Sequence, residues 1–170
     1  MAGASRWRRA ARAFLLPRPT RALALRAALV AAAAFLAFRF VARPALVVGE
    51  SMEPTYSARG FNFVLPWAYR SGGPARGDVV VLRWAGERKE LLKRVVAFEG
   101  ETVEWRDGAC LVNGAPLDEP YVKRPCDWTR KPLTVAPGCV YAVGDNRSMP
   151  MENHACGEID RARIAGRPLW

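Results

Sequence analysis

Acidic residues and lysine are absent from the first 43 residues of this 170-residue chain, where nine arginines lie. The rest of the chain carries 17 basic and 16 acidic residues, so the formal charge of +10 belongs almost entirely to the amino-terminal segment. A body with a net charge of +1 does not continue a nucleic-acid-binding arm, and no recognisable DNA- or RNA-binding motif follows the arginines. We therefore expect no nucleic-acid partner.

Long apolar runs are absent with one exception, the alanine-rich stretch 22–38. Its 17 residues make about 25 Å of helix, which is at the short end of what spans a bilayer. Arg26 lies near its start, from which a long side chain can reach the headgroups. The arginines before the run predict a cytoplasmic amino terminus. We expect a basic tail at residues 1–21, a single transmembrane anchor at 22–43 and an exported domain at 44–170. A cleaved signal peptide is the alternative.

Cysteine is scarce, and none of the four cysteines is spaced as Cys-x-x-Cys, which argues against a zinc site. All four lie in the part expected to be exported: Cys110, Cys126, Cys139 and Cys156. They fit an oxidising compartment and could form two disulfides, for which the sequence does not choose among the three pairings. We expect neither a metal nor an organic cofactor.

Sustained helical periodicity is absent after the anchor, whose helix we expect to end at Pro44. Short apolar stretches predict strands at 45–48, 61–67, 78–84, 91–98, 102–106, 109–112 and 140–143. Asp107-Gly108 and Asn113-Gly114 predict tight turns. We therefore expect a mainly β fold, a small antiparallel barrel or a set of curled sheets, with one amino-terminal transmembrane helix. The proline-rich stretch 116–137 is predicted to be a surface excursion.

Aromatic residues gather soon after the first predicted strand: Phe61, Phe63, Trp67 and Tyr69. Aromatic side chains favour the membrane interface, but they also fill the cores of small β domains. Both interpretations stay open.

A serine and a lysine suggest the chemistry of the exported domain. Ser51 lies in the segment 49–55, and Lys93 follows about forty residues later among apolar neighbours. Serine is a poor nucleophile at neutral pH and needs a nearby base. Apolar surroundings disfavour an ammonium group and lower the pKa of a lysine, so Lys93 is a candidate to accept the Ser51 proton. The pair predicts a serine hydrolase.

Four segments in order, 49–55, 76–81, 93–96 and 144–147, resemble those of the type I signal peptidases, Ser/Lys proteases that remove signal peptides from exported proteins. The resemblance implies that Ser51 is the nucleophile and that Lys93 is the general base of an acyl-enzyme mechanism. It implies cleavage after small residues, with preprotein signal peptides, the lipid bilayer and the secretion machinery as partners. The catalytic domain would face the periplasmic or extracytoplasmic side of the inner or plasma membrane.

The resemblance also implies supporting roles. The backbone N–H of Ser51 is the first expected oxyanion donor. Some relatives add a serine hydroxyl two positions earlier, where this chain has Gly49, so the second donor stays open. Asp145 and Arg147 are expected to brace the site as an ion pair.

The last motif departs from the family pattern. Pro150 stands where relatives have a serine thought to orient the lysine, and Ser148, Asn153 or a carbonyl group are the candidates to replace that serine. His154, the single histidine, stands at the position of a family arginine. Its simplest role is packing, and a Ser51-His154-Asp145 triad is the alternative.

Three functional alternatives remain. Two are peptidases: one dedicated to a single substrate such as a conjugative pilin, and a mitochondrial inner-membrane enzyme. The third is a catalytically silent paralogue that binds preproteins without cutting them, and the altered residues 150–154 favour it.

Overall fold

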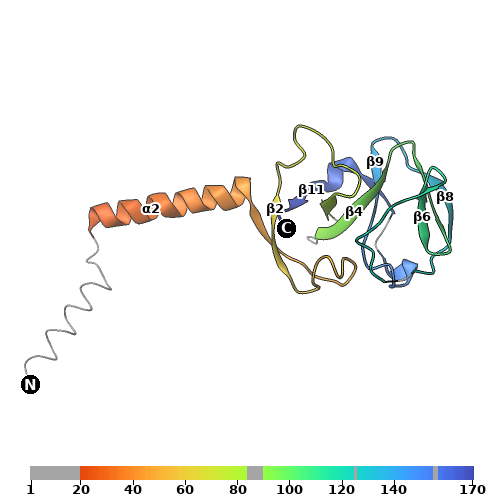
Figure 1. Cartoon of the computed structure of the whole chain (residues 1–170). Helices are drawn as coiled ribbons and strands as arrows, with labels where there is room; N and C mark the ends of the chain where they lie inside the picture. Colours follow the sequence, from red (N-terminus) through yellow and green to blue (C-terminus); the bar gives the residue numbers. More distant parts are fainter. Residues whose placement is uncertain (1–19, 84–89, 125, 155–156) are drawn as a thin grey trace, which may run out of the picture. The chain divides into compact units, whose positions relative to one another are not determined.

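The computed structural model describes residues 20–83, 90–124, 126–154 and 157–170. The chain divides into two compact units, the first ending at Arg39 and the second comprising Phe40–Trp170. Figure 1 shows the helix of the first unit and the labelled strands of the second.

The helix of the first unit is α2 (Arg21–Leu36), which continues as a π-helical turn, η1 (Ala37–Val41). Thr20 caps it, because its Oγ1 accepts a hydrogen bond from the Leu23 N–H at 3.1 Å. None of the helical residues is buried. Within the described ranges, Arg21–Val41 is the one helix long and apolar enough to cross a membrane, judged by length and composition. It ends before Pro44, which lies in the first strand. Residues 1–19 of the predicted tail lie outside the described residues.

The second unit consists of antiparallel strands in two sheets. The larger sheet has the order β1 (Arg43–Leu46), β2 (Phe61–Leu65), β11 (Ile164–Pro168), β3 (Val79–Arg83), β4 (Glu90–Phe98), β9 (Cys139–Val143) and β10 (Gly157–Asp160). The smaller sheet has the order β7 (Ala115–Pro116), β6 (Ala109–Val112), β5 (Thr102–Arg106) and β8 (Arg130–Thr134). Two 3₁₀ turns, η2 (Met151–Asn153) and η3 (Arg161–Arg163), flank β10.

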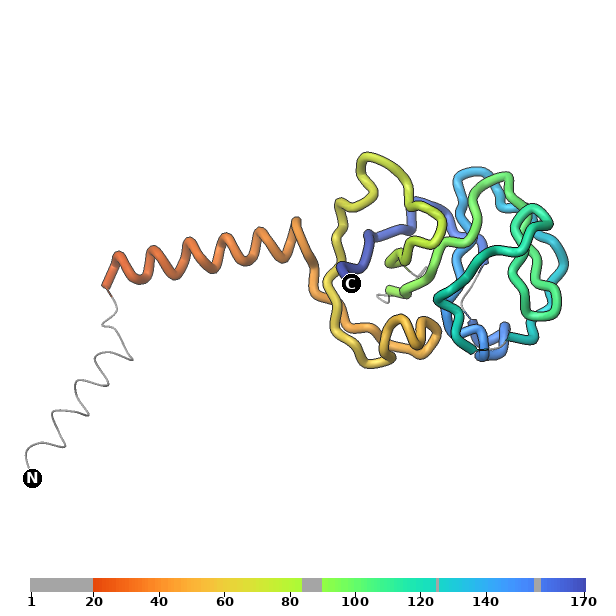
Figure 2. The backbone as a smooth tube through the Cα atoms, in the orientation of Figure 1, coloured from red at the N-terminus to blue at the C-terminus, as the bar shows by residue number. Residues whose placement is uncertain are grey.

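The mainly β prediction is confirmed. The described strands form open, curled sheets rather than a closed barrel (Figures 1 and 2). The predicted turn at Asp107-Gly108 joins β5 to β6, and both residues have positive φ angles, 48° and 83°. Aspartate and glycine tolerate that conformation better than most residues do, which is why the dipeptide predicted the hairpin. The first predicted strand, 45–48, lies two residues earlier, at 43–46.

The core is built on both faces of β4. Val96 packs with Trp105 and Tyr141 between the two sheets, whereas Val95 packs with Val80 and other residues of the larger sheet. Successive side chains of a strand point to opposite faces, so one strand serves two clusters. Full burial of an aliphatic side chain such as that of Val95 or Val96 stabilises the folded state by about 1.5–3 kcal/mol.

The proline-rich stretch 116–137 is not simply a surface excursion. Trp128 is 4% exposed and Val135 is 1% exposed, and both belong to the cluster around Trp105. Trp128 also donates through Nε1 to the Met149 carbonyl at 2.9 Å. The prediction was wrong here because proline and polar residues indicate irregular backbone, and irregular backbone can still carry buried side chains.

The described cysteines are free thiols: Cys110, Cys126 and Cys139. Burial raises the pKa of the Cys110 thiol to about 12. Cys156 lies outside the described residues. No disulfide therefore joins the three described cysteines, although the sequence allowed two disulfides among the four.

Candidate active site

Ser51 and Lys93 meet, although 42 residues separate them in the chain. Ser51 lies in the turn that follows β1, and Lys93 lies on β4 opposite Val80 of β3. Lys93 Nζ donates to Ser51 Oγ at 2.8 Å, and the lysine is 1% exposed. A nucleophile and a base within hydrogen-bond reach satisfy the geometric requirement for an activated serine.

Gly49 begins the turn with a φ angle of 101°, a conformation that side-chain-bearing residues rarely adopt. A Cβ atom at this position would meet no atom within 4 Å, so the backbone conformation, rather than space, calls for glycine. Met52, 2% exposed, anchors the turn in the core, and the N–H of Tyr56 bonds to the Met52 carbonyl at 2.9 Å.

The loop after β9 holds the backbone of the turn. Asn146 donates through its backbone N–H to the Ser51 carbonyl and through Nδ2 to the Glu50 carbonyl, both at 3.0 Å. Gly144 lies so close to the turn that a Cβ atom there would come within 2.1 Å of the Ser51 carbonyl oxygen. The loop and the nucleophile turn are therefore in direct backbone contact.

Asp145, 1% exposed, joins three elements. Its carboxylate accepts from Arg94 Nε at 2.8 Å and Nη2 at 2.6 Å, and from Thr55 Oγ1 at 2.6 Å. Arg94 directly follows Lys93 on β4, and Thr55 belongs to the nucleophile turn. Burial opposes the charge on Arg94, but the bonds to Asp145 outweigh it and raise the pKa of the guanidinium.

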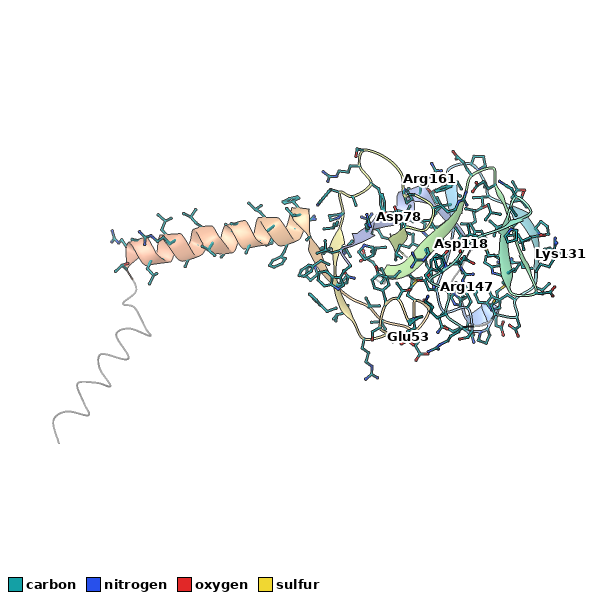
Figure 3. All side chains as sticks on the ribbon, viewed as in Figure 1. Glu53, Asp78, Asp118, Lys131, Arg147 and Arg161 are labelled. Carbon is teal, nitrogen blue, oxygen red and sulfur yellow. The ribbon has the colours of Figure 1, made fainter. Side chains whose placement is uncertain are left out.

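The predicted ion pair between Asp145 and Arg147 is not formed. Arg147, 1% exposed, pairs instead with Glu119, with Nη1 at 3.0 Å from Oε2 and a second, shorter contact from Nη2 to Oε1. Its Nε donates to the Gly144 carbonyl at 2.8 Å. Figure 3 labels Arg147 among the interior side chains. Asp145 and Arg147 do not pair with each other because Asp145 bonds to Arg94 and Thr55, whereas Arg147 bonds to Glu119.

One short segment contacts both arginines. The Tyr121 hydroxyl donates to Glu119 Oε1 at 2.8 Å, and the Tyr121 ring lies 3.9 Å from the guanidinium carbon of Arg94, a cation–π distance. Burial, and then the neighbouring Glu119 charge, raises the pKa of Tyr121 well above its usual value. Sequence reasoning missed both residues. The available signal was an acid and a tyrosine in a proline-rich stretch, which does not indicate the arginines they contact.

The segment before β3 holds the strand that carries the lysine. The Gly77 N–H bonds to the Val95 carbonyl at 2.8 Å, the Val95 N–H bonds to the Asp78 carbonyl at 2.9 Å, and Arg94 Nη1 bonds to the Gly77 carbonyl at 2.6 Å. These bonds attach Gly77 and Asp78 to the strand that carries Lys93.

A cavity of about 510 Å³ includes Ser51 in its wall. Its other sides come from β1, from residues 47–49 after β1, from residues 90–92 at the start of β4, and from positions on β2, β3 and β11. Most lining side chains are apolar, and Arg43 pairs with Glu90 at 2.7 Å in the same wall. Over the described ranges, no group of three or more His, Cys, Asp or Glu side chains is arranged to hold a metal ion.

Comparison with known proteins identifies the family of the chain. The model of the family described as signal peptidase, peptidase S26, matches residues 20–170. The chain belongs to this family. The predicted family and the predicted class of activity, a serine endopeptidase, are therefore confirmed.

Individual relatives span most of the chain. It is 33% identical over 138 residues to a signal peptidase I of Leptolyngbya laminosa, an alignment that covers 76% of this chain and 68% of the relative. It is 30% identical over 151 residues to signal peptidase IB of Staphylococcus aureus, with 78% of each chain covered. A crystal structure of a signal peptidase I from Enterococcus faecalis is 26% identical, with a TM-score of 0.46, and the match covers 55% of this chain and 95% of that one.

The departures from the signal peptidase pattern lie around Asn146. Ser148 Oγ donates to Asn146 Oδ1 at 2.7 Å, and Asn153 is exposed, so neither takes the position expected of a lysine-orienting hydroxyl. His154, 5% exposed, places Nε2 at 2.8 Å from the Asn146 carbonyl oxygen. The alternative triad is therefore not formed, because the histidine bonds to Asn146.

Proposed function

We propose that this chain is a membrane-anchored endopeptidase that removes signal peptides from exported preproteins by means of Ser51 and Lys93. The observation that carries the proposal is the 2.8 Å contact between Lys93 Nζ and Ser51 Oγ at a lysine that is 1% exposed. Removing the amine from water disfavours its ammonium form, and the neutral amine is the form that accepts a proton.

The reaction proceeds in two halves. Ser51 Oγ attacks the scissile carbonyl carbon while Lys93 Nζ takes the hydroxyl proton. Lys93 then gives this proton to the leaving amide nitrogen as the C–N bond breaks, so the mature protein departs and the signal peptide stays as an ester on Ser51. A water molecule, deprotonated by Lys93, then attacks the ester carbonyl carbon. The bond to Ser51 Oγ breaks, Lys93 returns the proton to Oγ, and the signal peptide leaves with a free carboxyl group. The Ser51 N–H is the first oxyanion donor, and Gly49 supplies no hydroxyl as a second.

The 510 Å³ cavity is the proposed site of the preprotein segment. Among the described strands β1 is the terminal strand of the larger sheet and has β2 as its one neighbour, so no described strand occupies its other edge, where an extended peptide could pair. The apolar side chains of the wall suit the small residues expected before the cleavage point.

Exposed apolar side chains near this cavity support a membrane-facing surface. Leu46 is 76% exposed and Val48 is 84% exposed, and both line the cavity. Phe61, Trp67, Leu169 and Trp170 are also exposed. Of the four aromatics left open above, Phe61 and Trp67 thus fit the membrane interface, whereas Tyr69 packs against the core. We propose that this surface meets the bilayer on the extracytoplasmic side, with residues 22–43 as a single anchor and with preproteins delivered by the secretion machinery.

The decisive experiment uses the purified full chain in detergent and a preprotein with an Ala-x-Ala cleavage site. Ser51→Ala and Lys93→Ala are expected to abolish cleavage. Ser57→Ala and Lys131→Ala are matched controls, since both residues are exposed, and Figure 3 labels Lys131 at the edge of the molecule. Cleavage that survives in either dyad variant would overturn the mechanism.

The same assay separates the alternatives. A parent enzyme that cuts none of a panel of preproteins would favour the silent paralogue. Cleavage of one pilin precursor alone, among many preproteins with similar sites, would indicate a dedicated peptidase.

A further inference from the structure

The His154 side chain is buried beside the loop after β9. Its ring meets the Trp128 ring edge-on, with centroids 4.9 Å apart, and a Cβ atom added to Gly144 would lie 2.5 Å from His154 Cε1. The remaining contact is polar, from Nε2 to the Asn146 carbonyl oxygen at 2.8 Å. The histidine therefore touches the backbone of the two loop residues, Gly144 and Asn146, that themselves contact the nucleophile turn.

The geometry determines the tautomer. A carbonyl oxygen only accepts hydrogen bonds, so Nε2 must carry the proton and donate it. Nδ1 is then an unprotonated acceptor, and it is buried with no hydrogen-bond partner among the described residues. A proton on Nδ1 would turn the buried ring into a cation near the Arg147 guanidinium. The titratable groups near the ring are Lys93 on β4, together with Arg147 and Asp145 on the loop.

The same surroundings favour the neutral ring. Burial lowers the pKa of His154 to about 4, and the charge of Arg147 acts in the same direction. At neutral pH the ring is therefore a fixed donor of a single hydrogen bond.

We propose that His154 is a positioning residue of the proteolytic reaction, which acts through Asn146 to hold Ser51 against Lys93. The chain of contacts is continuous. His154 Nε2 fixes the Asn146 carbonyl, the Asn146 N–H fixes the Ser51 carbonyl, and Asn146 Nδ2 fixes the Glu50 carbonyl. A small shift of Asn146 would move two consecutive peptide groups of the nucleophile turn and so lengthen the 2.8 Å contact between Ser51 and Lys93.

This role differs from packing alone and from the triad. A packing histidine needs only its shape, whereas the proposed role needs the N–H at Nε2. A triad histidine exchanges a proton with serine, whereas this one acts at a distance through a backbone carbonyl. The inference rests on the proposed Ser51–Lys93 mechanism.

Two variants of nearly equal size separate the roles. In His154→Gln the side-chain amide can place an N–H near the position of Nε2, and His154→Met has similar length without a donor. For the full chain in detergent, we expect His154→Met to lower kcat about tenfold with KM within twofold of the parent value, and His154→Gln to keep at least half of the parent kcat. Equal loss in both variants, or no loss in His154→Met, would overturn the proposal. So would a fall in melting temperature with kcat unchanged.

A second measurement needs no variant. The chain has one histidine, so ¹⁵N-histidine NMR of the parent enzyme, purified without a histidine tag, reports this ring alone. The expected spectrum is that of the tautomer protonated at Nε2 near neutral pH. A ring protonated at Nδ1, or at both nitrogens, would overturn the proposal even if His154→Met failed to fold. If the parent did not cleave preproteins, the proposed function would fail while this spectrum still tested the His154 contact.

Discussion

Arg94 donates two hydrogen bonds to the Asp145 carboxylate, from Nε to Oδ1 at 2.8 Å and from Nη2 to Oδ2 at 2.6 Å. The carboxylate is fully buried and Thr55 also donates to it. One anion thus ties together the strand that carries the lysine, the loop after β9 and the turn that carries the serine. A two-point contact fixes orientation as well as distance, which suits a site in which a few tenths of an ångström decide whether a proton is transferred.

Asp145→Asn is expected to destabilise the protein by about 3–5 kcal/mol, because it leaves the Arg94 guanidinium, whose side chain is only 11% exposed, without its counter-ion. Cleavage should fall at least tenfold as Lys93 and Ser51 lose their common support. Urea unfolding and preprotein cleavage measure the two effects. Glu104→Gln is the matched control, since its partner Arg106 is 66% exposed and such pairs contribute about 0–1 kcal/mol. Equal losses in the two variants would contradict the central role of Asp145.

Gly144→Ala is expected to lower kcat by about a hundredfold or more. The new methyl group would lie 2.1 Å from the Ser51 carbonyl oxygen, so the nucleophile turn must move away from the loop. Gly72→Ala is the control, because a Cβ atom there would meet nothing within 4 Å. Steady-state kinetics on a peptide substrate, with melting temperatures for both variants, provide the measurement. An active Gly144→Ala enzyme would show that the close approach is not required.

Glu119→Gln is expected to cost about 2–4 kcal/mol of stability, because Arg147 is buried and loses its counter-charge. The neighbouring Asp118→Asn should change stability by less than about 0.5 kcal/mol, since Asp118 is exposed. Chemical denaturation of both variants gives the comparison. If the two behaved alike, the segment around Glu119 would be a surface loop with no bracing role.

His154 should make the protein less stable as the pH falls. Its pKa is about 4 in the folded state and 6.5 ordinarily, so between these values the unfolded chain binds more protons than the folded chain. Stability from this residue is complete above pH 6.5 and is lost progressively toward pH 4, by an amount on the order of 3 kcal/mol. In His154→Gln this part of the pH dependence should disappear, whereas that of the carboxylates should stay. Urea unfolding at pH 7, 6, 5 and 4 tests this, and parallel curves for parent and variant would refute it.

The residue pair with the chemistry was predictable because it is carried by short segments. The segments 49–55 and 93–96 can each be recognised from a few consecutive residues. The apolar neighbours of Lys93 predicted that its side chain would be buried. The strands and the Asp107-Gly108 hairpin were predictable for the same reason, since side-chain alternation and backbone preference are local properties. The segments taken singly did not predict which of them would contact one another in the folded domain.

The sequence by itself therefore determined the class of fold, the family and the two residues expected to react. Tertiary structure decided which charges meet, because 26 basic and 16 acidic residues allow many pairings and only proximity in space selects among them. Arg94 lies 51 residues from Asp145, and Arg147 lies 28 residues from Glu119, distances over which no local pattern operates. The same holds for His154, whose contact with Asn146 exists because the loop after β9 folds back against Trp128. Buried polar groups must find partners wherever the packed backbone places them, and that placement is a property of the whole domain.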